Sequence, residues 1–161
     1  MTVDDAKAYL RLETAQDDAL IAGLIAGARG LCEAFLGQRL IRADLTDMVP
    51  ADGAWHRLAA APVATITQVG APALPLGVYA IDIDPAGEGW VRVTGGGMVP
   101  VAYRAGIADD DSGVPAAIAQ GIVRLAAHLY VDRTDASAPP AGVAALWRPF
   151  RRVRLSAGVR A

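Results

Sequence analysis

Few side chains in this sequence have the type and spacing that chemistry requires. His56 and His128 are the only histidines among 161 residues, and neither has a second His or a Cys at metal-ligand spacing. Cys32 is the single cysteine, so it cannot form an intrachain disulfide, and it falls on the apolar side of a predicted helix. A free thiol in that position behaves as a small hydrophobic group. These residues favour structural roles over metal binding or nucleophilic catalysis.

One acidic loop resembles a calcium site, but its spacing does not fit. Asp82, Asp84 and Glu88 could supply oxygen ligands around a glycine turn. The fifth loop position is Ala86 and the twelfth is Val93, where a calcium loop needs a ligand and a bidentate Glu. We interpret these acids as turn residues.

The glycine run at 95–97 resembles a phosphate-binding loop, but no Lys-Ser/Thr pair follows it and no helix is predicted after it. The sequence also contains no G-x-S-x-G motif, Ser/His/Asp set or paired carboxylates that stand out. We therefore predict that the chain is not an enzyme and needs no metal or cofactor.

The segment 143–155, VAALWRPFRRVRL, is the most unusual part of the sequence because it interleaves large apolar groups with arginines. Trp and Arg dominate protein-protein hot spots, so we predict a docking segment. Its proposed partner-binding residues are Leu146, Trp147, Arg148, Phe150, Arg151, Arg152, Arg154 and Leu155. One alternative is a segment that folds back on its own domain. Another is nucleic-acid binding, against which the net charge of −2 argues.

Helical periodicity predicts the elements that position this segment. Apolar residues recur at steps of three and four over 15–36, which indicates a long amphipathic helix with Thr14 as its N-cap and Gly37 at its end. Similar signals predict helices over about 3–12, opened by a Thr2–Asp5 capping pair, and over 115–132.

Three glycines interrupt the long helix, at Gly23, Gly27 and Gly30. Each weakens a helix by about 1 kcal/mol relative to Ala. We therefore expect something to pack closely against them.

Residues 38–104 change to the period of two that is typical of strands. The predicted strands are 40–46, 55–58, 63–69, 78–83, 90–93 and 99–103, separated by Gly, Pro and Asp turns. The predicted fold class is α+β: a small helical bundle of two N-terminal helices and a C-terminal helix, with an inserted antiparallel β region and an extended basic tail.

The predicted organisation is a single domain over 1–134, followed by a spacer and docking tail over 135–161. The spacer, 134–142, has the sequence TDASAPPAG, which we expect not to hold a helix. The first residues lack the pattern of a signal peptide, and no run of about 18 apolar residues occurs. We expect a soluble protein made in the cytoplasm, with no membrane partner.

Four segments together resemble the head-tail connector (adaptor) proteins of tailed phages, the gp6-like and gp8-like group. They are FLGQRLI after the helix pair, YRAG before an acidic stretch, VPAAIAQGIVRLAAHLYVDR, and LWRPFRRVRL. The resemblance runs nearly end to end, although Phe150 stands where tyrosine is usual. The Ala-, Arg- and Gly-rich composition also resembles that of high-GC bacteria, which allows a prophage or a gene transfer agent.

The resemblance implies a structural subunit of the virion neck, assembled in the bacterial cytoplasm. Such proteins form a ring, commonly of twelve subunits, that sits below the portal protein, extends the DNA channel and provides a surface for stopper or tail-completion proteins. The arginine-rich segment would then dock on the portal.

Near the start of the chain, four acids are candidates for facing the channel, where they would keep passing DNA from binding. They are Asp4, Asp5, Asp17 and Asp18. DNA would pass without sequence-specific binding. The alternative function is a small DNA-binding or regulatory protein that uses its C-terminal arginines.

Overall fold

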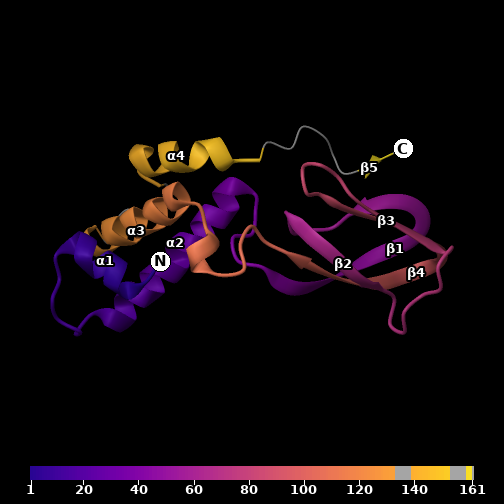
Figure 1. Cartoon of the computed structure of the whole chain (residues 1–161), viewed down its shortest axis with the longest axis horizontal. Coiled ribbons are helices and arrows are strands. Elements are labelled where there is room, and N and C mark those ends of the chain that lie inside the picture. The colour runs from indigo at the N-terminus through magenta and orange to yellow at the C-terminus, as the bar shows by residue number, and fades with distance from the viewer. Residues whose placement is uncertain (133–138, 153–158, 161) are drawn as a thin grey trace. The chain divides into compact units, whose positions relative to one another are not determined.

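The computed structural model describes residues 1–132, 139–152 and 159–160 of the chain. Its contacts divide it into two compact units (Figure 1). The helical unit comprises Met1–Gly37 and Asp110–Arg152, and the sheet unit comprises Gln38–Asp109 together with the short C-terminal strand. The predicted α+β fold with an inserted antiparallel sheet is confirmed.

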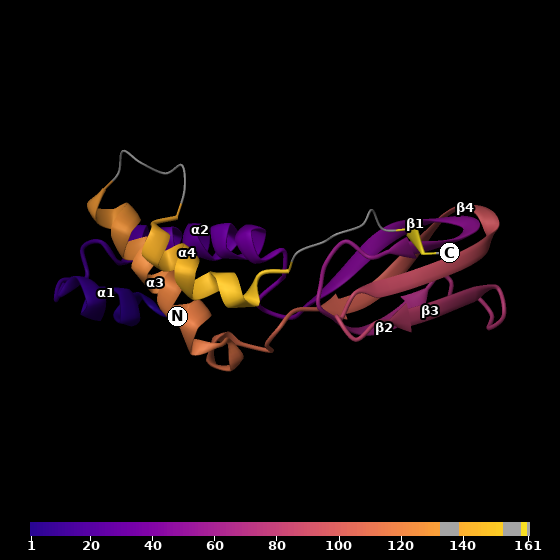
Figure 2. The same cartoon turned by 90° about the horizontal axis from the view of Figure 1, so that it is seen from above.

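The helical unit contains α1 (Val3–Leu10), α2 (Asp18–Leu36), α3 (Ala116–Val131) and α4 (Ala141–Trp147). Two short 3-10 turns accompany them, η1 (Asp111–Gly113) and η2 (Arg148–Phe150). α2 packs against α1 and α3, and α4 packs along α3 (Figure 2). The buried side chains from all four helices include Ala6, Ile21, Ile25, Ala28, Cys32, Ile118, Ile122, Leu125, Val143 and Trp147.

The first three helices were predicted, and α4 was not. The prediction that 134–142 cannot hold a helix is wrong for Ala141 and Gly142, which open α4. Val143 and Trp147 lie four residues apart and are both buried, so they share one face of this helix. Burial of that face stabilises a helix of seven residues, which would be too short to form on its own.

The caps of the first two helices agree in part with those predicted from the sequence. Thr2 and Asp5 form the predicted capping box, and Gly37 ends α2 with a left-handed backbone, φ +65°. The prediction that Thr14 caps the long helix is wrong, because α2 begins at Asp18 with Asp17 as its N-cap. Tertiary contacts of these two acids fix that start: the Lys7 ammonium lies 2.8 Å from Asp18, and the Tyr130 hydroxyl donates to Asp17 at 2.6 Å.

The sheet unit contains β1 (Ala43–Arg57), β2 (Val63–Val69), β3 (Tyr79–Ile83), β4 (Gly89–Ala105) and β5 (Val159–Arg160). Their order is β2-β4-β1-β5, with β3 also paired to β4, and every strand pair is antiparallel. β4 is therefore central, because β1 lies along one of its edges while β2 and β3 share the other.

β1 and β4 are each longer than predicted. The strands predicted at 40–46 and 55–58 overlap the two ends of β1, although residues 40–42 and 58 lie outside it, and those at 90–93 and 99–103 lie within β4. The expected turn at Pro50–Gly53 is instead a set of register shifts, in which a strand absorbs extra residues and bends without ending. The glycines at 95–97 supply the positive φ angles that β4 needs opposite these shifts.

One polar contact joins the core of the sheet unit to the loop after β1. Tyr103 is buried on β4, and its hydroxyl donates to Asp47 Oδ2 at 3.0 Å and accepts from the Ala60 N–H at 3.2 Å. Burial raises the pKa of Tyr103 to about 12. The phenol therefore stays protonated and can donate this bond.

Candidate functional site

The predicted docking segment is divided between the core and the surface of the helical unit. Trp147 is fully buried, its indole N–H donates to the Ile118 carbonyl at 3.2 Å, and its ring lies 5.8 Å from that of Phe35. Gly121 on α3 leaves the space that this indole occupies. In this structure Trp147 is therefore an anchor of α4 within its own unit.

The residues around Trp147 are partly or fully exposed. Arg148 and Arg151 are exposed, while Leu146, Phe150 and Arg152 are half-buried. The Arg151 guanidinium lies 5.3 Å from the centre of the Phe35 ring, and the Arg152 N–H donates to the Leu36 carbonyl at 3.0 Å. Arg154 and Leu155 lie outside the described residues. Two exposed arginines thus stand on a short segment that Trp147 fixes to the unit.

The four predicted channel acids all belong to the helical unit, at the starts of α1 and α2, and three of them have partners within it. Asp5 accepts the Thr2 N–H in the capping box, which holds the pKa of its carboxyl below the ordinary value. Asp17 and Asp18 make the contacts to Tyr130 and Lys7 given above. Asp4 is exposed in the first turn of α1, where a negative charge interacts favourably with the helix dipole.

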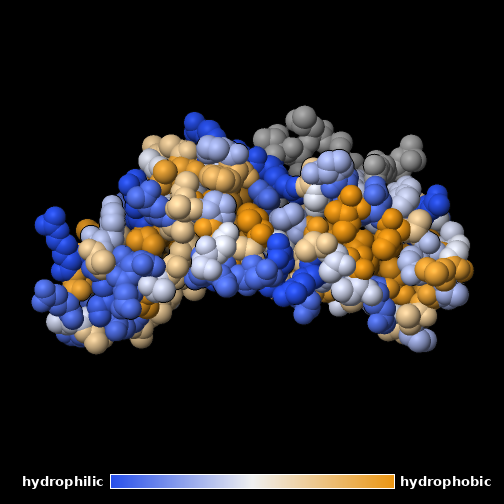
Figure 3. Space-filling model, in the orientation of Figure 1, coloured by the Kyte–Doolittle hydropathy of each residue, from blue (hydrophilic) through white to orange (hydrophobic). Residues whose placement is uncertain are grey.

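The sheet unit carries an apolar surface that the sequence prediction did not single out. Met48 and Pro50 on β1 lie opposite Pro100 and Met98 on β4, so all four share one face of the strand pair. The methionines are 57 % and 54 % exposed. Apolar residues reach the surface over the strands in the view of Figure 3. The alternation along β1 could have indicated this face only if β1 had been predicted as one strand.

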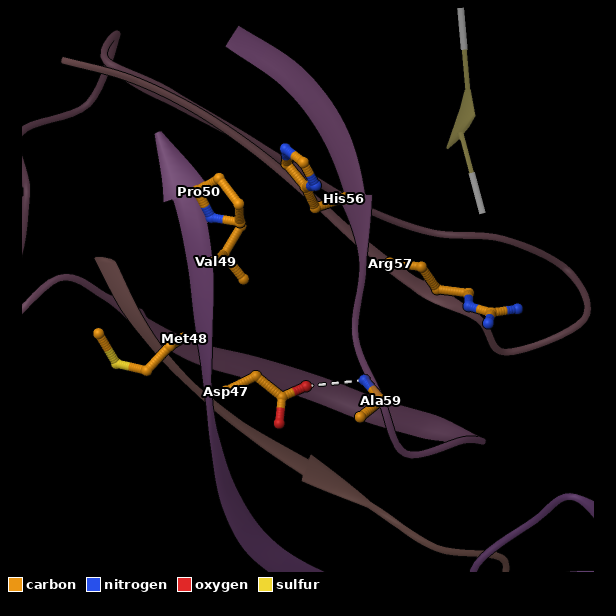
Figure 4. A pocket seen from close by; sticks show the side chains of 7 residues that line it. All are labelled: Asp47, Met48, Val49, Pro50, His56, Arg57 and Ala59. Carbon is orange, nitrogen blue, oxygen red and sulfur yellow. Dashed lines mark hydrogen bonds between the residues drawn. The ribbon is translucent and has the colours of Figure 1, made fainter. Parts of the chain in front are cut away.

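A hollow of about 490 Å³ lies beside this surface, between the two halves of the bent β1 (Figure 4). It is lined by Asp47, Met48, Val49, Pro50, His56, Arg57 and Ala59. Its polar groups serve internal contacts: Asp47 Oδ2 also accepts the Ala59 N–H at 2.7 Å, and His56 Nε2 lies 2.8 Å from Asp52 Oδ1. This hydrogen bond from His56 is the main reason why the pKa of Asp52 is lowered.

The lining of this hollow offers little for catalysis. It contains no Ser, Thr, Cys or Lys that could act as a nucleophile. Over the described ranges, no three His, Cys, Asp or Glu side chains are grouped so that they could hold a metal ion.

No protein-family profile matches the sequence, and no curated protein matches it either. Solved structures do match. A chain in the neck of an empty gene transfer agent particle, computed with C6 symmetry, is 26 % identical with a TM-score of 0.76, and the match covers 98 % of this chain and 92 % of that one.

Two further structures give the same result. A chain in the virion of a native gene transfer agent particle is 27 % identical (TM-score 0.73, covering 98 % and 92 % of the two chains). A chain in the neck of a native particle, computed with C12 symmetry, is 26 % identical (TM-score 0.72, covering 97 % and 91 %). Over nearly its whole length, this chain is thus similar to a structural component of the neck of a gene transfer agent particle.

Proposed function

We propose that this protein is a head-tail connector, or adaptor, subunit that assembles into a ring below a portal protein and extends the DNA channel. The observation that carries this proposal is the likeness to neck chains along 97–98 % of the sequence, in particles computed with C6 and C12 symmetry. These symmetries support a ring of identical subunits, and twelve copies satisfy both.

The surface chemistry supports a structural rather than an enzymatic role. The described residues combine an exposed Met/Pro face with exposed arginines at the end of the helical unit. Methionine-rich surfaces adapt to the shape of a partner, and arginine is enriched at interfaces between proteins. An adaptor needs several such surfaces, because it contacts its own copies, the portal and a stopper or tail-completion protein.

The route of DNA through the ring is part of the same proposal. Asp4, Asp5, Asp17 and Asp18 belong to one unit and would give a channel wall a negative potential, which discourages DNA from binding. The Lys7 ammonium beside Asp18 and the N-terminal ammonium beside Asp5 offset part of this potential, whereas the Tyr130 hydroxyl at Asp17 carries no charge. A ring structure with these carboxylates on its outer rim would exclude the channel role.

We expect the portal contact to depend on the exposed arginines rather than on Trp147. Reversing their charge in an Arg148→Glu/Arg151→Glu variant should weaken portal binding at least tenfold without unfolding the helical unit, since exposed side chains contribute little to stability. Binding can be measured by interferometry with immobilised portal protein. The matched control is Arg39→Glu/Arg104→Glu, which makes the same charge change at exposed sites of the sheet unit. Equal portal binding by both variants and the wild type would contradict the docking role.

The ring itself is tested by electron microscopy of the purified chain, alone and mixed with the portal protein of the same gene cluster. We expect class averages of the mixture to show a ring of this chain on the portal, even if the free subunit is monomeric. A portal that remains bare at micromolar concentrations of the chain would overturn the proposal. DNA titration at low and physiological salt would then test the DNA-binding alternative, which predicts a steep loss of affinity with salt.

A further inference from the structure

The face of α2 that points away from the core of the helical unit is exposed and mostly apolar, and the half-buried Glu33 lies near one edge of it. Its members are Ala19, Leu20, Ala22, Gly23, Ala26, Gly27, Gly30, Leu31 and Ala34, which we call the α2 outer face. At 3.6 residues per turn they cover about half of the helix circumference. Of the three charged residues of α2, Asp18 pairs with Lys7 and Arg29 pairs with Asp111. Glu33 lies at the edge of the α2 outer face, beside Ala26 and Gly30.

Such a face is unusual on a helix that contacts water. The solvent side of a helix in a globular protein is normally polar, and a helix that is apolar all round is normally buried. Leu20 and Leu31 are each 42 % exposed. The close neighbour expected at the three glycines is not found among the residues of the subunit that the structure describes, since a Cβ at Gly23, Gly27 or Gly30 would have no atom within 4 Å. In Figure 1, helices α3 and α4 both lie above α2.

The α2 outer face continues into a hollow of about 390 Å³. This hollow is lined by Ala22 and Ala26 together with Met1, Thr2, Val3, Ile25 and Arg29. The surface is therefore shaped as well as apolar. A partner could place a side chain in the hollow while its backbone approaches the glycines.

We infer that the α2 outer face is the surface by which one copy of this chain packs against the next copy in the ring. The inference rests on the proposed function, and the second copy is its occupant because the matched neck structures were computed with C6 and C12 symmetry. In a cyclic ring each subunit contacts two neighbours through two different surfaces, so the α2 outer face meets another part of the neighbouring copy. Small side chains allow that part to approach closely, because the distance between packed helices depends on the residues at the contact.

A single substitution can separate assembly from folding. Gly27→Lys places a long charged side chain on the α2 outer face, where the isolated subunit has open space. Lysine favours a helix more than glycine does, so the thermal midpoint of the free subunit should stay the same or rise. The fraction of subunits in rings on the portal, counted by electron microscopy, should fall at least tenfold.

The matched control is Gly142→Lys on α4, where a Cβ would also have no atom within 4 Å and the residue is exposed. We expect Gly142→Lys to form rings like the wild type. If Gly27→Lys also forms them normally, the inference is wrong while the proposed function stands. If Gly27→Lys forms rings in solution but no longer binds the portal, the face contacts the portal instead, and the inference is again wrong. If the wild type forms no ring, both the proposed function and the inference that rests on it are wrong.

Thiol labelling gives a second measurement on assembled rings. Cys32 is buried, and burial raises its pKa to about 12, so the native thiol should react very slowly with a maleimide. Ala34→Cys adds one exposed thiol on the α2 outer face. Its labelling rate should fall at least tenfold when the subunit enters a ring. An unchanged rate in rings would overturn the inference.

Discussion

Replacing Trp147 with alanine is expected to lower the free energy of unfolding of the helical unit by about 3–5 kcal/mol. The indole is fully buried, so its removal leaves a large cavity among α2, α3 and α4. The Ile118 carbonyl also loses the hydrogen bond from the indole N–H. Urea denaturation followed by far-UV circular dichroism measures this loss directly.

Two further variants show whether the effect comes from packing. Gly121→Ala should also destabilise the unit, because its new Cβ would lie 2.8 Å from Trp147 Cε2 and displace the ring. Arg151→Ala, which removes an exposed neighbour, should change the free energy by less than about 0.5 kcal/mol. A Trp147→Ala protein as stable as the wild type would show that the indole does not anchor α4. It would favour the original prediction that Trp147 binds a partner.

The Trp147 environment shows where sequence reasoning was sufficient and where it failed. The spacing of Ile118, Ile122 and Leu125 predicted α3 correctly, because a helix shows its buried face through its own period. The glycine at 121 carries no local signal that an indole from 26 positions further along the chain fills its space. Composition alone could not separate a buried tryptophan from an interface tryptophan, since both kinds of site favour the residue.

The sheet unit shows the same limit for turns. Pro50, Asp52 and Gly53 have the chemistry of a turn, and that chemistry also suits a bulge. Only the pairing of β1 with β4 on both sides of this point decides between the two. Among the candidate surfaces, Arg148 and Arg151 were predicted as partner-binding residues from the composition of their segment, and both are exposed. The glycines of the α2 outer face indicated a close neighbour, which is not found within the described part of the subunit.

Replacing Gly106 with alanine is expected to destabilise the sheet unit by about 2–6 kcal/mol, from backbone strain and overpacking together. Gly106 follows β4 with φ +145°, a conformation that side chains other than glycine rarely adopt. A Cβ there would meet the backbone of Ile41 and Arg42, at 2.6 Å from the Ile41 carbonyl carbon. That backbone cannot move freely, because the Arg42 N–H donates a hydrogen bond to the Ala108 carbonyl at 2.7 Å.

The contribution of the close approach can be separated from that of the φ angle. Gly77 also has a positive φ, +106°, but a Cβ at that position would have no atom within 4 Å. Gly77→Ala should therefore show only the strain component, about 1–3 kcal/mol. A Gly106→Ala variant that loses clearly more stability in urea denaturation identifies the contact with 41–42 as the reason for glycine. Equal losses would mean that this backbone moves aside and that φ alone requires glycine at 106.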